Sequence, residues 1–154
     1  MEFWVLGRRH IVNYKCARKH IVISIGDPND PDPVSLPVNS NRIDTLYLRF
    51  HDWDQRGKEL FEKDESLFPS AVLFDAGMAQ RILEFVISYK GKFDLIICQC
   101  EAGISRSAGT AAALSRLMNG EDEYFFKRFL PNRLVYRTIL DVAYFTDLRY
   151  DNKT

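Results

Sequence analysis

The stretch that most limits how this chain can fold begins at Leu95. Residues 95–98 (LIIC) are apolar on both faces of a strand, a pattern typical of a buried strand in the middle of a parallel sheet. A tight segment of small residues follows, and a helix is expected to begin at about 105–107 and to end at Asn119-Gly120. A buried strand that leads directly into such a helix indicates an α/β protein.

Strand-like and helix-like patterns alternate along the rest of the chain. The proline-rich segment 26–41 is expected to be a loop, and the charged segment 51–70 a surface loop with room for one helical turn. We therefore predict one α/β domain over 1–154, with a central, mainly parallel sheet flanked by helices. The expected strands are 3–6, 20–25, 45–50 and 95–98, and the further helices are 76–90, with Asp75 as N-cap and Gly91 after its end, 121–129 and 132–148.

The amino-acid composition argues against some classes of function. The chain of 154 residues has 21 basic and 21 acidic side chains, so its formal net charge of zero argues against non-specific binding to nucleic acid or to an anionic membrane. Its three cysteines are an odd number without a disulfide-rich pattern, which favours a reducing compartment. The first residues, MEFWVLGRRH, do not resemble a signal peptide. We expect a cytoplasmic protein with neither nucleic acid nor membrane as a partner.

The segment after the buried strand has the residues of an anion-binding site. It lies where open α/β sheets bind ligands, at the carboxyl end of a central strand and at the start of a helix, whose first N–H groups lack intrahelical partners. Small residues such as Gly103 allow successive N–H groups to curve around an oxyanion, and Arg106 offers a bidentate fork. A tetrahedral phosphate dianion fits this arrangement better than a planar carboxylate.

Cys100 lies at the base of the same segment. A helix N-terminus and a nearby guanidinium group stabilise a thiolate, which is the nucleophilic form of cysteine. The thiolate would lie beneath the phosphorus atom, opposite the leaving oxygen, and the hydroxyl group of Ser107 is placed to hydrogen-bond to the sulfur. This arrangement predicts phosphoryl transfer through a cysteinyl-phosphate.

The segment CEAGISRSAG, which begins at Cys100, resembles the signature of the cysteine-dependent protein tyrosine and dual-specificity phosphatases. The likeness extends from about Thr45 to Leu148, and includes the Pro131-Asn132 pair. It implies hydrolysis of a phosphotyrosine protein or a small aryl phosphate, with no cofactor and no metal. It also implies that the loop binds phosphate, or a sulfate ion in its place, through Glu101, Ala102, Gly103, Ile104, Ser105 and Arg106.

The chain departs from this family at Gln99, where the family usually has a histidine that braces the loop and stabilises the thiolate. Glutamine can still hydrogen-bond to the backbone, but it has no charge. This departure leaves open a second hypothesis, a phosphate-binding module with little turnover. Residues 1–44 match the family poorly, and they predict nothing about catalysis.

The family also uses an aspartic acid, after an earlier strand, to protonate the leaving oxygen. Asp52 and Asp54 both follow the strand TLYLRF, with Trp53 between them as a possible loop anchor. Asp52 is nearer to the strand end and is the preferred candidate, although either residue can also be an ordinary loop charge. Asp75 is a further candidate if it is not only a helix cap.

Other hypotheses for the same residues are weaker. Cys98 and Cys100 can both be small buried side chains, and a metal site would need further ligands from three histidines without recognisable spacing. Asp27, Asp30 and Asp32 lack the glycine and glutamate of a calcium loop. A sulfur-transfer enzyme also places a cysteine in an anion-binding loop, but the Arg106-Ser107 pair favours phosphate. Asn132 can cap a helix or brace the loop.

Overall fold

The computed structural model describes residues 1–147, in which four parallel strands form one sheet in the order β1-β4-β2-β3. The strands are β1 (Glu2–Gly7), β2 (His20–Gly26), β3 (Arg42–Arg49) and β4 (Leu95–Cys100). The apolar strand β4 lies between β1 and β2, so both of its edges are paired. The predicted central parallel sheet is therefore confirmed.

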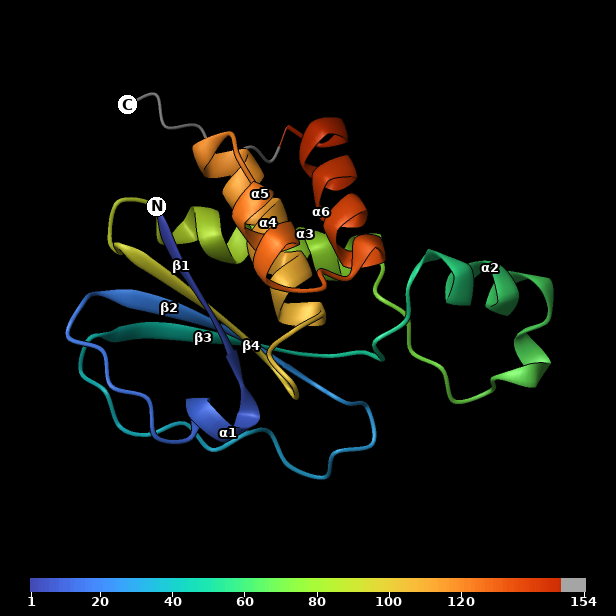
Figure 1. The fold of residues 1–154 in the computed structure, drawn as a ribbon, viewed down its shortest axis with the longest axis horizontal. Coiled ribbons are helices and arrows are strands. Elements are labelled where there is room, and N and C mark those ends of the chain that lie inside the picture. The colour runs from blue at the N-terminus through green and yellow to red at the C-terminus, as the bar shows by residue number, and fades with distance from the viewer. Residues whose placement is uncertain (148–154) are drawn as a thin grey trace.

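Helices cover the sheet unequally (Figure 1). One face carries α3 (Ala76–Ser88), α4 (Arg106–Asn119), α5 (Glu123–Arg128) and α6 (Arg133–Phe145), whereas the short α1 (Arg8–Ile11) and the connection between β2 and β3 cover the other. Asp75 caps α3, as predicted. The last helix was predicted to reach residue 148, which lies outside the described residues; α6 ends at Phe145. No helix among residues 1–147 is long and apolar enough to span a membrane.

The two faces of the sheet explain why β2 and β4 are almost continuously apolar. Ile21, Ile23 and Cys98 are among the residues packed beneath the helices, and Val22 and Ile97 contribute to a smaller core on the opposite face. Since successive side chains of a strand alternate between faces, a strand buried on both sides must be apolar at every position. The same alternation places Cys98 and Cys100 on the helix-covered face.

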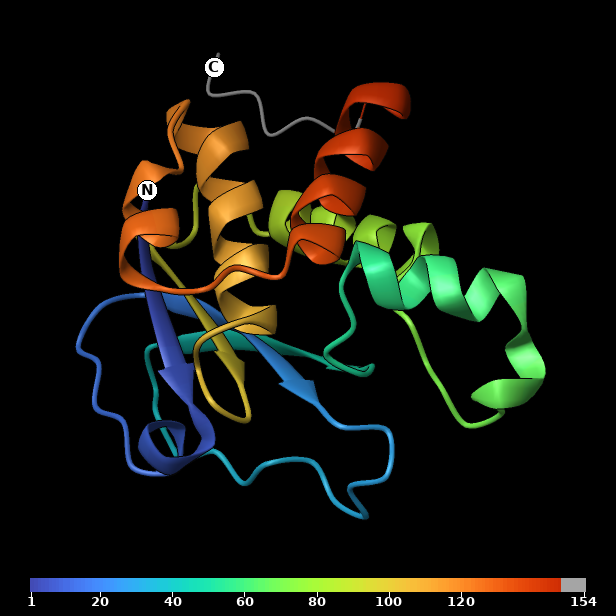
Figure 2. The same cartoon turned by 45° about the vertical axis from the view of Figure 1, so that its right-hand side comes forward.

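The prediction for residues 51–70 was wrong, because this segment contains a nine-residue helix, α2 (Gln55–Lys63), and a short 3-10 helix, η1 (Glu65–Leu67). Asp54 starts α2 by accepting a hydrogen bond from the Gly57 amide, and the rings of Phe61 and Phe68 pack edge-on against Trp53. None of the helix residues is buried, so the segment projects from the body of the molecule (Figure 2). The helix was not predicted because most of its residues are polar and exposed, so they do not form the buried apolar face by which a helix is recognised in a sequence.

A buried histidine lies at the amino end of β2. His20 Nδ1 donates to the Arg18 carbonyl at 2.7 Å, which leaves Nε2 to accept from the Tyr14 hydroxyl at 2.8 Å. Arg42 in turn donates to the Tyr14 hydroxyl at 3.1 Å. Burial lowers the pKa of His20 below its ordinary value, the charge of Arg42 lowers it further, and the hydrogen bond to the Arg18 carbonyl opposes the shift. The folded protein therefore favours the neutral ring.

Stability is expected to fall as the pH is lowered past about 6.5, the ordinary histidine pKa. The unfolded chain takes up a proton there, whereas folded His20 resists it until a lower pH, so the stabilisation present above 6.5 is lost on acidification. Urea unfolding at pH 7.5, 6.5 and 5.5 measures this loss. The variant His20→Gln should have a flatter profile across this window, and an equally steep profile in the variant would contradict the assignment.

Candidate active site

The segment between β4 and α4 is a loop, residues 101–105, at the carboxyl edge of the sheet. Its Gly103 has a φ of 70°, in the left-handed region that favours glycine. A Cβ atom at this position would lie 2.3 Å from the Gly7 amide nitrogen, so the loop rests directly against the backbone at the end of β1. Glycine is therefore required at residue 103 for two independent reasons, its φ and the space around it.

The backbone of the loop is held from outside through its carbonyl groups. The Glu101 carbonyl accepts from the Arg8 amide, and the Ile104 and Ser105 carbonyls accept from the amides of Leu130 and Asn132, at 2.9–3.2 Å. Among residues 1–147, the N–H groups of 102–105 have no acceptor. Because a backbone donor needs a partner, these four groups are available to a bound anion.

The two cysteines of β4 have different surroundings. Cys100 is buried at the base of the loop, and its Sγ lies 3.0 Å from the Ser107 hydroxyl on the first turn of α4. Cys98 is also buried, and this burial, together with the nearby Cys100 sulfur, raises the pKa of Cys98 well above its ordinary value. Cys98 is therefore held as a neutral thiol that packs in the core.

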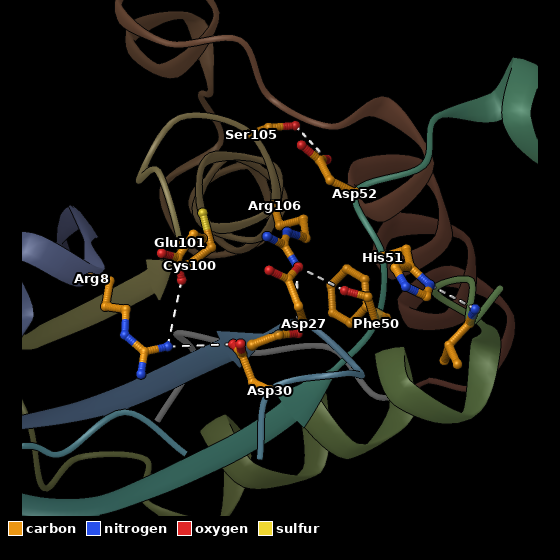
Figure 3. Close-up of polar contacts among 12 residues, drawn as sticks. Arg8, Asp27, Asp30, Phe50, His51, Asp52, Cys100, Glu101, Ser105 and Arg106 are labelled. Atoms are coloured by element: carbon orange, nitrogen blue, oxygen red, sulfur yellow. Dashed lines mark hydrogen bonds and ion pairs between the residues drawn. The ribbon is translucent and has the colours of Figure 1, made fainter. Parts of the chain in front are cut away.

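Arg106 begins α4, and only 5% of the residue is exposed. Its Nη1 donates to the Asp27 carboxylate at 2.7 Å and to the Phe50 carbonyl at 2.8 Å, with the Gly26 carbonyl at 3.4 Å (Figure 3). Its buried Nε has no hydrogen-bond partner among the described residues. One edge of the guanidinium group is thus fixed by the protein, and a buried donor remains for a ligand.

Gln99 occupies the position before the nucleophile candidate and is buried. It faces Ser24 across the β2–β4 pair; the Ser24 hydroxyl donates to Gln99 Oε1 at 2.5 Å, and Gln99 Nε2 donates to the Cys100 carbonyl at 2.9 Å. Both ends of the amide are therefore satisfied. The residue braces the backbone of Cys100 without a charge, by the kind of backbone hydrogen bond that the sequence allowed.

The two aspartate candidates, Asp52 and Asp54, differ in their hydrogen-bond partners. Asp52 Oδ1 accepts from Ser105 Oγ at 2.7 Å and from Asn132 Nδ2 at 2.8 Å, which holds the carboxylate beside the loop (Figure 3). Asp54 instead caps α2 through the Gly57 amide. Asp75 likewise caps α3. Of the three acids considered from the sequence, only Asp52 contacts the loop.

Asn132 serves both roles that the sequence left open. Its Oδ1 accepts from the Val135 amide at the start of α6, while its Nδ2 donates to Asp52 and, at 3.0 Å, to the Trp53 carbonyl. A Cβ atom at Gly109 would lie 2.6 Å from the Asn132 carbonyl oxygen, so α4 and the start of α6 are in close contact. Its backbone amide also donates to the Ser105 carbonyl, so Asn132 as a whole joins the acid-bearing segment to the loop.

Sequence reasoning missed Asp27 and Arg8, which lie within the first 44 residues. Asp27 directly follows β2, and the ends of parallel strands meet at one edge of a sheet, so its position after a buried strand was the available signal. The carboxylates of Asp27, Asp30 and Glu101 have oxygens within 4.8 Å of one another. Asp27 is already paired with Arg106, and the other two with Arg8 at 3.4 and 3.6 Å, so this cluster has its own cations.

No protein-family model and no curated protein sequence matches this chain. Among solved structures, it is similar to the human tyrosine phosphatase-like serine/threonine/tyrosine-interacting protein, with a TM-score of 0.50 and 16% identity over 82% of this chain and 77% of that one. A weaker similarity is to PTPMT1, with a TM-score of 0.45 and 13% identity over 84% of this chain and 77% of that one. The chain therefore has a tyrosine-phosphatase-like fold.

Proposed function

We propose that this chain is a cysteine-dependent phosphatase that hydrolyses phosphomonoesters, with phosphotyrosine or a similar aryl phosphate as substrate. The observation that carries the proposal is the convergence of a thiol, unpaired loop amides and the unpartnered Arg106 Nε at the carboxyl edge of the sheet. All of these groups suit a phosphate dianion above Cys100, and the sequence from Cys100 to Ser107 resembles the phosphatase signature.

In the first step, the Cys100 thiolate attacks phosphorus, and the bond between phosphorus and the leaving oxygen breaks. Asp52 gives its proton to that oxygen; both hydrogen bonds to this residue go to Oδ1, so Oδ2 is the atom that carries the proton. The loop amides and Arg106 stabilise the charge on the phosphoryl oxygens. The products are the free phenol, or the free alcohol from an alkyl ester, and a cysteinyl-phosphate.

In the second step, Asp52 removes a proton from water, which attacks the phosphorus of the cysteinyl-phosphate. The bond between phosphorus and Sγ breaks, inorganic phosphate leaves, and the thiolate is regenerated. The Ser107 hydroxyl, 3.0 Å from Sγ, stabilises the departing sulfur by a hydrogen bond. No step needs a metal ion, because the loop and Arg106 supply the positive charge.

A phosphate-binding module with little turnover is the second candidate. The observation that favours it is Gln99, which satisfies the Cys100 carbonyl without bringing a charge near the thiol. Steady-state turnover of a nitrophenyl phosphate distinguishes the two candidates, because a binding module would bind phosphate at the loop and release no phenol.

Replacing the nucleophile should separate binding from chemistry. Cys100→Ser is expected to lower turnover to below about one-thousandth, since an unactivated hydroxyl replaces the thiolate, while calorimetry still detects phosphate at the loop. Cys98→Ser is the matched control, because it makes the same atomic change two residues away in the core. It should cost roughly 1–3 kcal/mol of stability and leave turnover in place. Equal loss of activity in both variants would refute the assignment.

The role of Asp52 is tested through the leaving group. General acid assistance is worth about 10²–10⁴-fold and matters more for an alkoxide than for a nitrophenolate. Asp52→Asn should therefore slow an alkyl phosphate more than a nitrophenyl phosphate and remove the alkaline limb of the pH–rate profile. Asp54→Asn keeps the helix cap, because asparagine caps as well as aspartate, and should show neither effect. If the leaving-group effect follows Asp54 instead, the two roles are exchanged.

Asp27 is expected to act by orienting Arg106. In Asp27→Ala, Nη1 keeps only carbonyl partners, and kcat/KM should fall by about tenfold, the amount of one hydrogen bond to a charged group. Asp27→Asn retains an oxygen acceptor and should recover much of the loss. Asp32→Ala, an exposed acid in the same connection, is the control. If Asp27→Ala has the same kcat/KM as the wild-type protein, the backbone carbonyls are sufficient to orient Arg106.

A further inference from the structure

A cleft of about 700 Å³ opens beside the candidate phosphate loop. Its walls come from α2 on one side and from the start of α6, with the segment that joins it to α5, on the other. We call it the α2–α6 cleft. Asp52 and Ser105 line it and also belong to the candidate active site, so the cleft is continuous with the place where the phosphoryl group is proposed to bind.

Three arginines line this cleft: Arg56, Arg133 and Arg137. All three are exposed, and among residues 1–147 none of them forms an ion pair with a carboxylate. The two acids in the lining are otherwise engaged, since Asp52 accepts from Ser105 and Asn132 and Asp54 caps α2. The lining therefore has three positive and two negative groups, which gives it a net positive charge, and in the described part of the chain none of the three arginines is paired with either acid.

Two of these arginines occupy electrostatically unfavourable positions in the free protein. Arg133 is the first residue of α6, which has the neutral Asn132 as N-cap and no acidic residue in its first turn, whereas Arg56 shares the start of α2 with the carboxylate of Asp54. Positive charge is disfavoured at a helix N-terminus, and Arg133 and Arg137 repel each other across one helical turn. A bound anion would relieve both effects, whereas a neutral ligand would relieve neither.

Apolar residues make up much of the rest of the lining. Leu60 and Leu130 are 47% and 76% exposed, and Phe126 and Phe129 also line the cleft. The Arg133 guanidinium lies over the Phe126 ring, 5.2 Å from its centroid, which fixes its direction. A suitable ligand has both acidic groups and a bulky apolar group within a short length, as an acidic peptide segment does.

The opposite side of the loop is richer in carboxylates. In Figure 3, Asp30 and Glu101 lie away from Asp52 and Ser105, with Arg106 between the two groups. Asp30 and Glu101 share Arg8, and the Asp27 carboxylate is within reach of both. A broad anionic surface such as a membrane would meet these carboxylates as well as the arginines. A chain that enters through the cleft meets the arginines without meeting Asp30 and Glu101.

We propose that the α2–α6 cleft binds the acidic peptide segment that flanks the phosphorylated residue of a phosphoprotein substrate. The carboxylates of this segment contact Arg56, Arg133 and Arg137, and a bulky apolar side chain packs against Leu60 and Leu130. This assignment rests on the proposed function, because it requires the phosphorylated side chain to occupy the loop above Cys100.

The test compares two phosphotyrosine peptides that differ only in their flanks, one with glutamate residues and one with glutamine at the same positions. The wild-type protein should have the higher kcat/KM for the acidic peptide. In the double variant Arg133→Gln/Arg137→Gln this preference should fall by roughly fivefold or more, since each exposed ion pair contributes about two- to fivefold. Arg81→Gln, on exposed α3 surface outside the cleft, should retain the full preference.

A binding measurement separates failure of the cleft from failure of the enzyme. Cys100→Ser protein is titrated with both peptides by calorimetry, and an arginine-dependent preference for the acidic peptide supports the cleft even if the wild-type protein turns over no substrate. Equal affinity and equal kcat/KM for the two peptides would overturn the proposal that the α2–α6 cleft binds an acidic peptide, and they would leave the phosphatase proposal in place. Tighter binding to vesicles of phosphatidylcholine and phosphatidylserine than to the acidic peptide also overturns it.

Discussion

The buried guanidinium group of Arg106 is the constraint on which the carboxyl edge of this protein depends. A charged side chain that is 5% exposed needs partners, and Arg106 obtains them from the ends of two other strands. Asp27 follows β2, and Phe50 follows β3. The ion pair and the carbonyl bond thus tie two strand ends to the first turn of α4, and they leave Nε without a partner among residues 1–147.

The close approach of two glycines adds a second constraint. Gly103 contacts the backbone of Gly7, so the loop can take its shape only when β1 is paired beside β4. Together with the outward bonding of the loop carbonyls, this contact leaves the loop amides without partners. The proposed binding of an anion in the loop therefore depends on how the surrounding backbone is bonded, in addition to the dipole of α4.

Although the net charge is zero, charged side chains are unevenly distributed around the loop 101–105. Acidic side chains cluster near Arg8, at the ends of β1 and β2, and unpaired arginines lie toward α2 and α6. Zero net charge disfavours non-specific anion binding over the whole surface, whereas the proposed peptide would meet only one side of this region. In the proposed complex, the arginines would select for acidic peptides, and the apolar surface at Leu60 and Leu130 would add contacts to a bulky side chain of the same peptide.

Patterns between near neighbours in the sequence determined much of this structure. The alternation of strands and helices, the caps at Asp75 and Gly120, the burial of 95–98 on both faces and the pairing of Cys100 with Ser107 all depend on residues a few positions apart. Local periodicity and steric preference encode such features directly. The helix at 55–63 escaped this reasoning because it buries no residue, so no apolar face marks it as part of the core.

Only the tertiary structure decided which distant groups complete the site. Asp27 pairs with Arg106 across 79 positions, and Asn132 with Asp52 across 80. Asp52 was already the preferred candidate from its place in the sequence, but its contacts with Ser105 and Asn132 could not be predicted, because no spacing in the sequence connects those residues to the segment after β3. These contacts follow from the strand order β1-β4-β2-β3, and that order is set by the packing of the whole sheet rather than by any local signal.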